Sequence, residues 1–312
     1  MIEADDILLD TTEKREYNVL ILGAGASMAY GFPSGWQLRH KILGLPQFKA
    51  AKNGVFASRD FGAETQFLDF KEAFKLSQKI SIDAFLGTRR EFSDIGKRCI
   101  AAVLLECEDR TKLFEESVDN SKDHWYQYLI NAITSKSWDE LDLSRIAVVT
   151  FNYDRSLLLY LHTTLVNIYK KDDDEVTEKL RELEIVNVYG SICDKFPTEA
   201  GWLPYDGSVT FEKITSAAQQ LNVIPEGLTE SPTLVRSRKL IRNARGVAFL
   251  GFGFDQINVE RLSAHRAFHS QLPTPRGTLL RSASGTAKGV TRSELARACS
   301  LMSKGEKFHI NS

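Results

Sequence analysis

NVLILGAGASMAYGFPSG, residues 18–35, is the stretch that decides the fold. Its first part is a short apolar run, Val19 to Leu22, that stops at glycine, which is typical of a buried strand in a parallel sheet. Gly23 and Gly25 follow, and residues without a Cβ let backbone amides approach a ligand closely. A helix beginning near Ala26 would direct its positive N-terminal end to the same place. The stretch therefore predicts a cradle for the pyrophosphate of a dinucleotide.

The match to the dinucleotide fingerprint is partial. The fingerprint has a third glycine three residues after the second, and this chain has Met28 there. A strand, turn and helix that bind nothing are therefore the alternative. Residues 31–35, GFPSG, add two glycines and Pro33 beside the cradle. They form a constrained loop, and loops on a rigid sheet often carry function.

The composition excludes several classes of protein. The chain has 312 residues, 43% of them hydrophobic, and its 40 Lys and Arg balance 41 Asp and Glu, so the chain as a whole does not bind nucleic acid through its net charge. No apolar run approaches the length of a membrane span, and the acidic N-terminus does not resemble a signal peptide. We therefore expect a cytoplasmic protein. The four cysteines include no Cys-x-x-Cys pair, so we expect no metal site.

Alternating strand and helix patterns predict an α/β fold, with a Rossmann-like parallel sheet flanked by helices, over a single domain. Strand patterns occur at residues 19–22, 146–151, 184–189 and 246–251. Helix patterns follow at residues 36–45, 155–169 and 232–243. Residues 45–145 have mostly helical patterns, including a capped helix start at Ser81, so we expect a helical insertion after the first strand-helix unit.

The four strand candidates end in the loops GAGAS, FNYD, YGS and GFGFD. In an open parallel sheet, ligands bind at the carboxyl ends of the strands. This shared layout is stronger evidence for a binding site than any one motif. The sequence therefore predicts that the four loops meet at one edge of the sheet and hold a nucleotide there.

The C-terminal segment, residues 261–312, has a different charge balance from the rest. It contains nine Lys or Arg and two Asp or Glu, and its RSASGTAKG stretch is poor in apolar residues. A mobile surface segment is one interpretation. A surface that docks a partner or contacts nucleic acid is the other, because phosphate contacts need clustered positive charge.

Three of the loops, in this order, resemble those of the sirtuin-like superfamily. GAGAS with GFPSG looks like its NAD phosphate loop and proline loop, TFNYD at 150–154 like its Thr-x-Asn-x-Asp segment, and FLGFG at 249–253 like its late glycine loop. The segments IDAFL at 82–86 and WYQYL at 125–129 are similar to the bacterial branch that acts in anti-phage defence. The resemblance covers about residues 17–260 and implies NAD as the substrate.

The resemblance also implies which residues contact NAD. They are Gly23, Ala24, Gly25, Ser27, Pro33, Gly190, Ser191, Gly251 and Gly253. It implies a homo-oligomer, and a partner such as a hexameric ATPase or a phage component that switches the activity on.

Two features depart from the family. The chain lacks the four-cysteine zinc set of zinc-bearing sirtuins, which argues against a deacylase. The family's catalytic histidine directly precedes a glycine at a strand end, and here Tyr189 precedes Gly190. Asn187, two residues earlier, is expected to share the strand face of Tyr189 because side chains alternate. Neither is a base near neutral pH, since Asn does not titrate and free Tyr titrates near pH ~10, so we expect both to contact the ribose.

Cleavage of the nicotinamide–ribose bond passes through a cationic, oxocarbenium-like sugar, as glycoside hydrolysis does. The leaving group becomes neutral as it departs, so the site needs no strong acid. Asn152 can orient water and bond a ribose hydroxyl, and Asp154 can accept from the nicotinamide amide or orient Asn152. Helix capping is the alternative for both residues.

These observations predict an NAD hydrolase that releases nicotinamide and ADP-ribose, with Asn152, Asp154, Tyr189 and Asn187 as its catalytic candidates. The family branch implies that it depletes NAD during anti-phage defence. A regulatory module that binds NAD or ADP-ribose without turnover is the main alternative. A nucleic-acid-associated subunit that uses the basic C-terminal segment is a third hypothesis.

Overall fold

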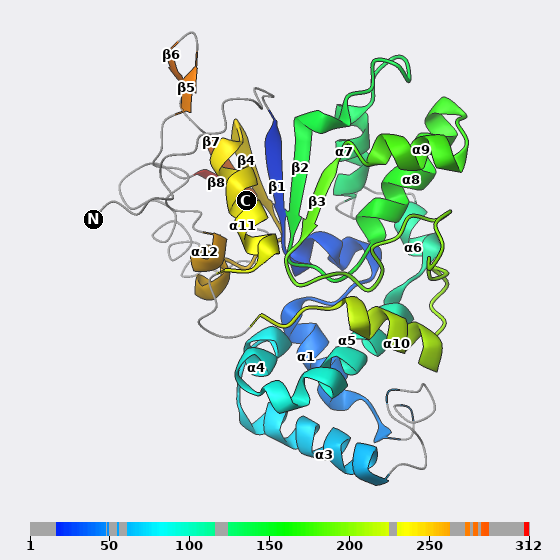
Figure 1. Cartoon of the computed structure of the whole chain (residues 1–312), viewed down its shortest axis with the longest axis vertical. Helices are drawn as coiled ribbons and strands as arrows, with labels where there is room; N and C mark the ends of the chain where they lie inside the picture. Colours follow the sequence, from blue (N-terminus) through cyan, green and yellow to red (C-terminus); the bar gives the residue numbers. More distant parts are fainter. Residues whose placement is uncertain are drawn as a thin grey trace.

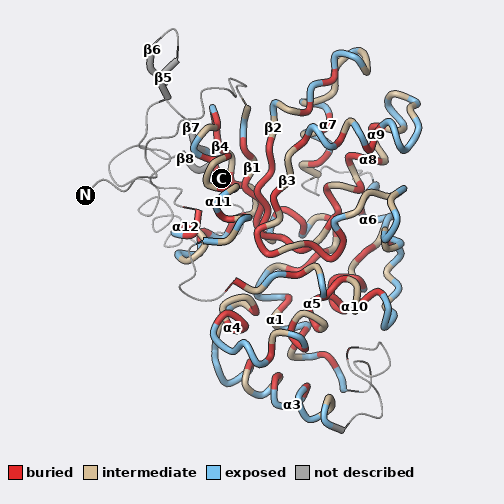
Figure 2. The backbone as a smooth tube through the Cα atoms, in the orientation of Figure 1, coloured by how far each residue is buried: buried red, intermediate tan, exposed pale blue. Residues whose placement is uncertain are grey.

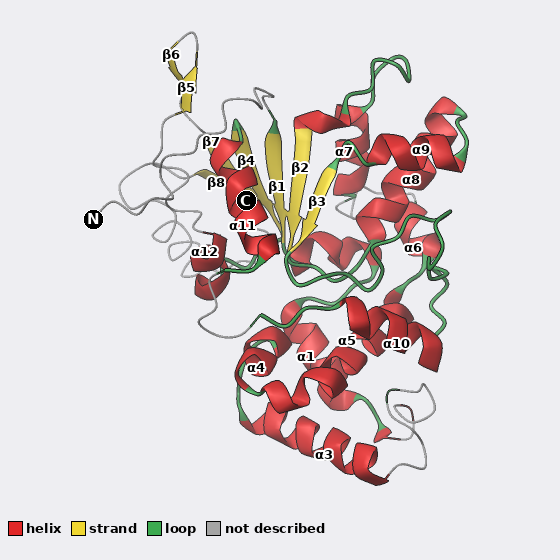
Figure 3. Ribbon diagram, viewed as in Figure 1, coloured by secondary structure: helices red, strands yellow, loops and turns green. Residues whose placement is uncertain are grey.

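The computed structural model describes residues 17–47, 49, 55, 61–115, 124–224, 230–262, 272–274, 277–279, 282–286 and 309–311. Strands form one layer, and helices flank it (Figure 3). The arrowheads of the strands point toward a group of helices at their carboxyl ends (Figure 1). The predicted α/β fold, a Rossmann-like parallel sheet flanked by helices, is confirmed.

The described sheet has six strands in the order β3-β2-β1-β4-β7-β8, and every neighbouring pair is parallel. Their bounds are β1 Asn18–Leu22, β2 Ile146–Thr150, β3 Glu184–Asn187, β4 Gly246–Leu250, β7 Ser282–Thr286 and β8 His309–Asn311. Two further strands, β5 Leu272–Thr274 and β6 Gly277–Leu279, form a separate antiparallel pair.

The pairing register of the four predicted strands aligns their carboxyl ends, where the four predicted loops begin. Leu22 at the end of β1 pairs with Thr150 of β2 and with Leu250 of β4. Thr150 in turn pairs with Asn187, the last residue of β3. The loops after these strands therefore start side by side at the carboxyl edge of the sheet.

Between β1 and β2 the chain is helical, and we call this part the helical insertion. It contains the 3₁₀ helix Ala24–Tyr30, α1 Gly35–Gly44, α3 Phe61–Leu76, α4 Ile82–Thr88, the 3₁₀ helix Arg90–Phe92, α5 Ser93–Cys107, α6 Arg110–Phe114, α7 Trp125–Ile133 and the 3₁₀ helix Leu143–Arg145. The predicted helix start at Ser81 is confirmed, because its side chain accepts a hydrogen bond from the amide of Ala84.

The remaining helices connect the later strands. They are α8 Ser156–Tyr169 and α9 Asp173–Leu180 after β2, α10 Phe211–Gln220 and α11 Pro232–Asn243 after β3, and α12 Gln256–Leu262 after β4. Helix α10 packs against α5 of the helical insertion, although more than 100 residues separate them (Figure 1). This contact joins the insertion to the segment that follows β3.

Two predictions about strands differ from the structure. The predicted strand 184–189 stops at Asn187, because the chain turns at Gly190 with a φ of +77°. Residues 282–286, for which a mobile surface segment is one of the two interpretations, form β7 and pair with β4. Their sequence, SASGT, has few strand-forming residues, so pairing with a neighbouring strand overrides local preference.

The core follows the strands and the inner faces of the helices (Figure 2). Val19, Ile21 and Val149 in the central strands are fully buried. The helical insertion has its own aromatic cluster, made by Phe67, Phe70, Phe74, Phe85 and Phe92. Within the described part of the chain, no helix is both long and apolar enough to cross a membrane.

Candidate functional site

The glycine loop after β1 packs directly on the loop after β4. The amide of Gly23 donates to the carbonyl of Leu250, and the amide of Gly25 donates to the carbonyl of Gly251, each at 3.0 Å. A Cβ on Gly23 would lie 2.5 Å from the carbonyl oxygen of Gly251. The glycines are thus needed for close packing of two backbones, and their own amides are hydrogen-bonded within the protein instead of being free for a phosphate.

The helix expected near Ala26 also differs from the expectation. Residues 24–30 form a 3₁₀ helix of seven residues that ends at Gly31, whose φ is +93°. Trp125 of α7 holds this short helix, because its indole nitrogen donates to the carbonyl of Ala26 at 2.7 Å. Tyr126 stacks on Tyr30 with ring centroids 3.8 Å apart.

Asn152 lies against the glycine loop. Its side-chain nitrogen Nδ2 donates to the carbonyl of Gly23 at 2.9 Å and to Oγ of Ser27 at 3.0 Å. The residue is 8% exposed, and its oxygen Oδ1 is buried without a hydrogen-bond partner among the described residues. Asn152 does not cap α8, which begins at Ser156. An unsatisfied buried acceptor is unusual and calls for a functional or structural explanation.

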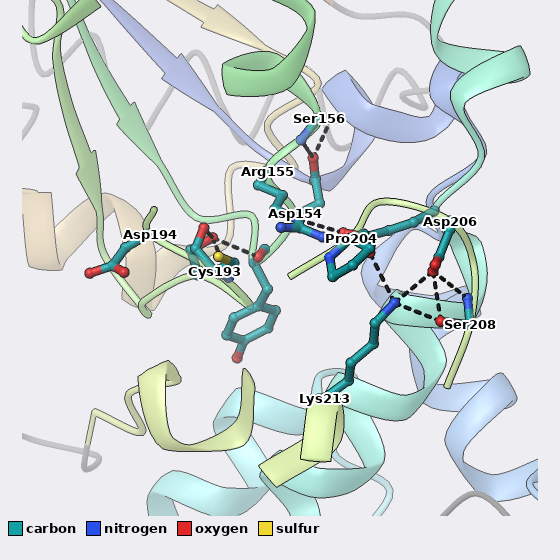
Figure 4. A network of polar contacts seen from close by, with 12 residues as sticks. Asp154, Arg155, Ser156, Cys193, Asp194, Pro204, Asp206, Ser208 and Lys213 are labelled. Carbon is teal, nitrogen blue, oxygen red and sulfur yellow. Dashed lines mark hydrogen bonds and ion pairs between the residues drawn. The ribbon is translucent and has the colours of Figure 1, made fainter. Parts of the chain in front are cut away.

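Asp154 belongs to the same polar network. Its carboxylate accepts from the amide of Ser156 at 3.1 Å and from the Ser156 hydroxyl, so it also fixes the start of α8 (Figure 4). The Ser156 hydroxyl in turn lies 2.7 Å from that of Tyr126. Burial raises the pKa of Asp154, and these hydrogen bonds oppose the rise.

A cavity of about 390 Å³ lies beside these residues, between the strands β2 and β3 and the helices α8 and α9. It extends from the carboxyl end of β3, at Asn187, to its first residue, Glu184. This volume falls in the range of ~300–1,000 Å³ typical of small-molecule sites. The cavity brings together five of the predicted site residues, which are Ser27, Asn152, Asp154, Asn187 and Ser191. Cys193, a buried free thiol, also lines it.

Other predicted site residues lie elsewhere. Pro33 lines a separate cavity of about 420 Å³ with Trp36 and His40. Gly253 is exposed, and a Cβ there would meet nothing within 4 Å. Gly190 forms a bridge to Leu221 in the segment after β3. Gly23, Gly25 and Gly251 belong to the packed pair of loops, and Ala24 is the first residue of the 3₁₀ helix.

Tyr189 does not share the face of Asn187, contrary to our expectation from strand alternation. The strand ends at Asn187, and the ring of Tyr189 packs against Phe151 and not into the cavity. The Tyr189 hydroxyl donates to Oδ1 of Asn258 at 2.6 Å and accepts from Nη1 of Arg261 at 2.7 Å. Burial raises the pKa of Tyr189 still further, so this phenol stays protonated near neutral pH.

Sequence reasoning missed Asp83, which lies in the first turn of α4. It accepts a hydrogen bond from the hydroxyl of Tyr153, the residue between Asn152 and Asp154. Burial raises the pKa of Asp83 to about 7, and the positive charge of Arg261 opposes the rise. Asp83 stands in the segment IDAFL, but an acidic residue in the first turn of a helix is ordinary, so its residue type does not mark it as a site residue.

Sequence reasoning also missed a buried ion pair beside the cavity. Arg155 Nε and Nη2 bind the two carboxylate oxygens of Glu108 at 2.7 and 2.9 Å, and both side chains are 1% exposed. The guanidinium lies 4.0 Å from the ring centroid of Trp202. Residue types alone do not reveal the pair, because 47 residues separate its members.

The turn-rich segment around 202–208 is fastened to α10 by Lys213. Its ammonium donates to Oδ1 of Asp206 and Oγ of Ser208, both at 2.6 Å, and to the carbonyl of Pro204 at 3.0 Å (Figure 4). The ammonium of Lys213 lowers the pKa of Asp206 to about 2. Trp202, whose ring lies over the Arg155 guanidinium, belongs to the same segment.

Comparison of the sequence with protein-family models and with curated proteins finds no match. Within the described ranges, no group of three or more His, Cys, Asp or Glu side chains is placed to hold a metal ion. Most of the basic segment 261–312 lies outside the described residues, and so does the nucleic-acid contact predicted for it.

Proposed function

We propose that this chain is an NAD hydrolase that releases nicotinamide and ADP-ribose. The observation that carries the proposal is Asn152, which reaches from the end of β2 to the glycine loop of β1 and lines a cavity that extends to the carboxyl edge of the sheet. Its buried Oδ1 lacks a partner among the described residues. A bound ribose hydroxyl or a reacting water would satisfy it.

The polar residues that line the cavity suit cleavage of the nicotinamide–ribose bond. As the nicotinamide leaves, positive charge develops on the ribose, and oxygen atoms placed beside it lower the barrier. Asn152 supplies an uncharged oxygen, and Asp154 supplies a carboxylate that the developing positive charge favours in its ionised form. Asn187 and Ser191 line the same cavity and supply further polar groups for the ribose.

The order of the loops supports a member of the sirtuin-like superfamily, from the bacterial branch that acts in anti-phage defence. On this proposal the chain depletes NAD in the cytoplasm as a homo-oligomer. A partner, such as a hexameric ATPase or a phage component, switches it on. Turnover in the chain alone is then slow, because the partner completes or opens the site.

One observation favours a second candidate function. Tyr189 occupies the position of the family's histidine, is buried, and is held by Asn258 and Arg261, so it is not a base. The amides of Gly23 and Gly25 are bonded within the protein. A module that binds NAD or ADP-ribose without hydrolysing it would retain the fold and need no base.

One experiment separates the two functions. The purified chain is mixed with NAD, free nicotinamide is measured by chromatography, and NAD binding is measured by calorimetry on the same sample. Release of nicotinamide with ADP-ribose in equal amounts supports the hydrolase. Binding of NAD without release, alone and in lysate of phage-infected cells, supports the module. If the chain neither binds NAD nor releases nicotinamide, both proposals are contradicted.

A further inference from the structure

The loop after β2 places three consecutive side chains in two different environments. Asn152 and Asp154 line the cavity, whereas Tyr153 between them is buried and does not line it. The Tyr153 hydroxyl donates to the carboxylate of Asp83. Asp83 lies on α4, so the helical insertion contacts this loop through a polar side chain.

The surroundings of Asp83 come from three further elements. Tyr153 comes from the loop after β2, and Tyr189, whose ring centroid lies 6.2 Å from that of Tyr153, comes from the turn after β3. Arg261 of α12 and Asp255, which precedes that helix, act on Asp83 by charge, in opposite directions. Arg261 in turn bonds the hydroxyl of Tyr189. The cluster therefore joins α4 and α12 to the loops after β2 and β3.

We propose that Asp83 is a positioning residue, which holds Asn152 and Asp154 in place through its hydrogen bond with Tyr153 and does so most firmly when ionised. The inference rests on the proposed function, because it adds a second ionisable group, beside Asp154, to the residues that act at that same site. Asp83 does not line the cavity itself and acts through Tyr153.

The strength of the Tyr153 hydrogen bond depends on the charge of Asp83. A hydrogen bond to a carboxylate is roughly twice as strong as one between neutral groups. Burial raises the pKa of Asp83 to about 7, with Arg261 lowering it and Asp255 raising it, so the charge changes across neutral pH. The loop that carries Asn152 is therefore held more firmly above pH 7 than below it.

The test uses three variants of the whole chain. Asp83→Asn keeps an acceptor for Tyr153 but removes the charge, and Tyr153→Phe removes the donor. Asp94→Asn makes the same chemical change at an exposed carboxylate on α5 that pairs with Arg98, and it serves as the matched control. For each protein, nicotinamide release is measured against pH. The side-chain amide signal of Asn152, identified by its loss in Asn152→Ala, is followed by nuclear magnetic resonance over the same range.

We expect the kcat of the wild type to rise with pH through a midpoint of about 7, and the Asn152 amide signal to shift with the same midpoint. Asp83→Asn and Tyr153→Phe remove both transitions and lower kcat above neutral pH by about tenfold, with KM nearly unchanged. Asp94→Asn behaves as the wild type.

The test distinguishes failure of the proposed hydrolase from failure of the positioning role of Asp83. A wild type that releases no nicotinamide, yet has an Asn152 amide that titrates only when Asp83 is present, contradicts the proposed hydrolase and leaves the positioning role standing. An amide that titrates equally in Asp83→Asn, or does not titrate in the wild type, overturns the positioning role whatever the activity. A pH profile of kcat that Asp83→Asn leaves unchanged overturns it too.

Discussion

The side-chain nitrogen of Asn152 donates to the carbonyl oxygen of Gly23 at 2.9 Å, across 129 residues of chain. The bond is possible because β1 and β2 pair in register up to Leu22 and Thr150, so the next residues of each strand meet. It joins the two motifs that the sequence offers most clearly, the glycine loop and the FNYD loop. The proposed site is built around this contact.

The packing of the two glycine loops predicts different roles for Gly251 and Gly253. A Cβ on Gly251 would lie 2.0 Å from the amide nitrogen of Ala26, and its φ of +56° disfavours other residues, whereas a Cβ on Gly253 meets nothing within 4 Å. We expect Gly251→Ala to lower the free energy of unfolding by at least about 1–3 kcal/mol.

Gly253→Ala should unfold like the wild type in denaturant, because the added methyl group has space. If Gly253 lies against NAD, this variant binds NAD more weakly by calorimetry while keeping its stability. Equal stability of Gly251→Ala and Gly253→Ala would contradict the close packing of the loop after β4 on the glycine loop.

The buried pair of Glu108 and Arg155 should matter far more for stability than an exposed pair. Removing one partner of a buried pair leaves an uncompensated charge and costs about 3–5 kcal/mol. We therefore expect Arg155→Met to lower the denaturation midpoint strongly. The matched control is Arg145→Met, which breaks an exposed pair with Asp142 and should cost ~0–1 kcal/mol. Similar losses in both variants would contradict the burial of the pair.

Asp83 predicts an unusual dependence of stability on pH. Its pKa is raised from 3.8 to about 7 by burial, so between these values the folded chain keeps a proton that the unfolded chain has lost. The free energy of unfolding therefore falls as pH rises through this window, by up to about 1.4 kcal/mol per pH unit. Above pH 7 the loss is complete.

Asp83→Asn removes this loss. We expect its melting temperature to exceed that of the wild type at about pH 8, and to vary less with pH below neutrality. Asp94→Asn should follow the wild type at every pH. Melting curves of wild type and Asp83→Asn that run parallel across the range would refute the ionisation assigned to Asp83.

A histidine introduced at position 187 should raise the rate of nicotinamide release, whereas one introduced at position 189 should not. Asn187 lines the cavity with Asn152, so Asn187→His places an imidazole beside the proposed reaction. Tyr189→His removes the hydroxyl that Asn258 and Arg261 bind in a buried cluster. We expect Asn187→His to raise nicotinamide release by about 10²-fold or more, the scale of general base catalysis, with stability retained.

Tyr189→His, in contrast, should lower the melting temperature without raising nicotinamide release. The comparison requires both variants to be assayed at equal concentrations of folded protein. A gain of activity in Tyr189→His and none in Asn187→His would mean that the substrate lies on the Tyr189 side of the sheet edge.

Much of the fold could be predicted because its main signals are local. The apolar runs before GAGAS, FNYD and GFGFD each form a strand, since short runs that stop at glycine or polar residues suit buried parallel strands. Strand β7 could not be predicted, because Ala283 is the single apolar residue of SASGT and the strand forms by pairing with β4. The early end of β3 depends on Gly190, whose positive φ is not visible in the sequence.

The site was predicted less completely, because its contacts join distant segments. Asn152 belongs to the FNYD motif, which directly follows an apolar strand pattern, so the sequence predicts its position at the carboxyl edge of the sheet. Asp83 and Glu108 lie in the helical insertion, and only the packing of that insertion shows which loop residues they meet. The role of Gly23 and Gly25 could not be predicted either, because their amides donate to a distant segment of the same chain, the end of β4 and the loop after it.

The most direct test of the central claim is the rate of nicotinamide release by Asn152→Ala. The control is Asn167→Ala, which changes an exposed asparagine on α8 whose side-chain nitrogen donates to the carbonyl of Thr163 in the same helix. Both proteins are checked for folding by circular dichroism and assayed with the same NAD. We predict that Asn152→Ala loses at least about 10²-fold in rate, the scale of a lost transition-state contact, while Asn167→Ala keeps the rate of the wild type. A folded Asn152→Ala that releases nicotinamide as fast as the wild type would contradict the account.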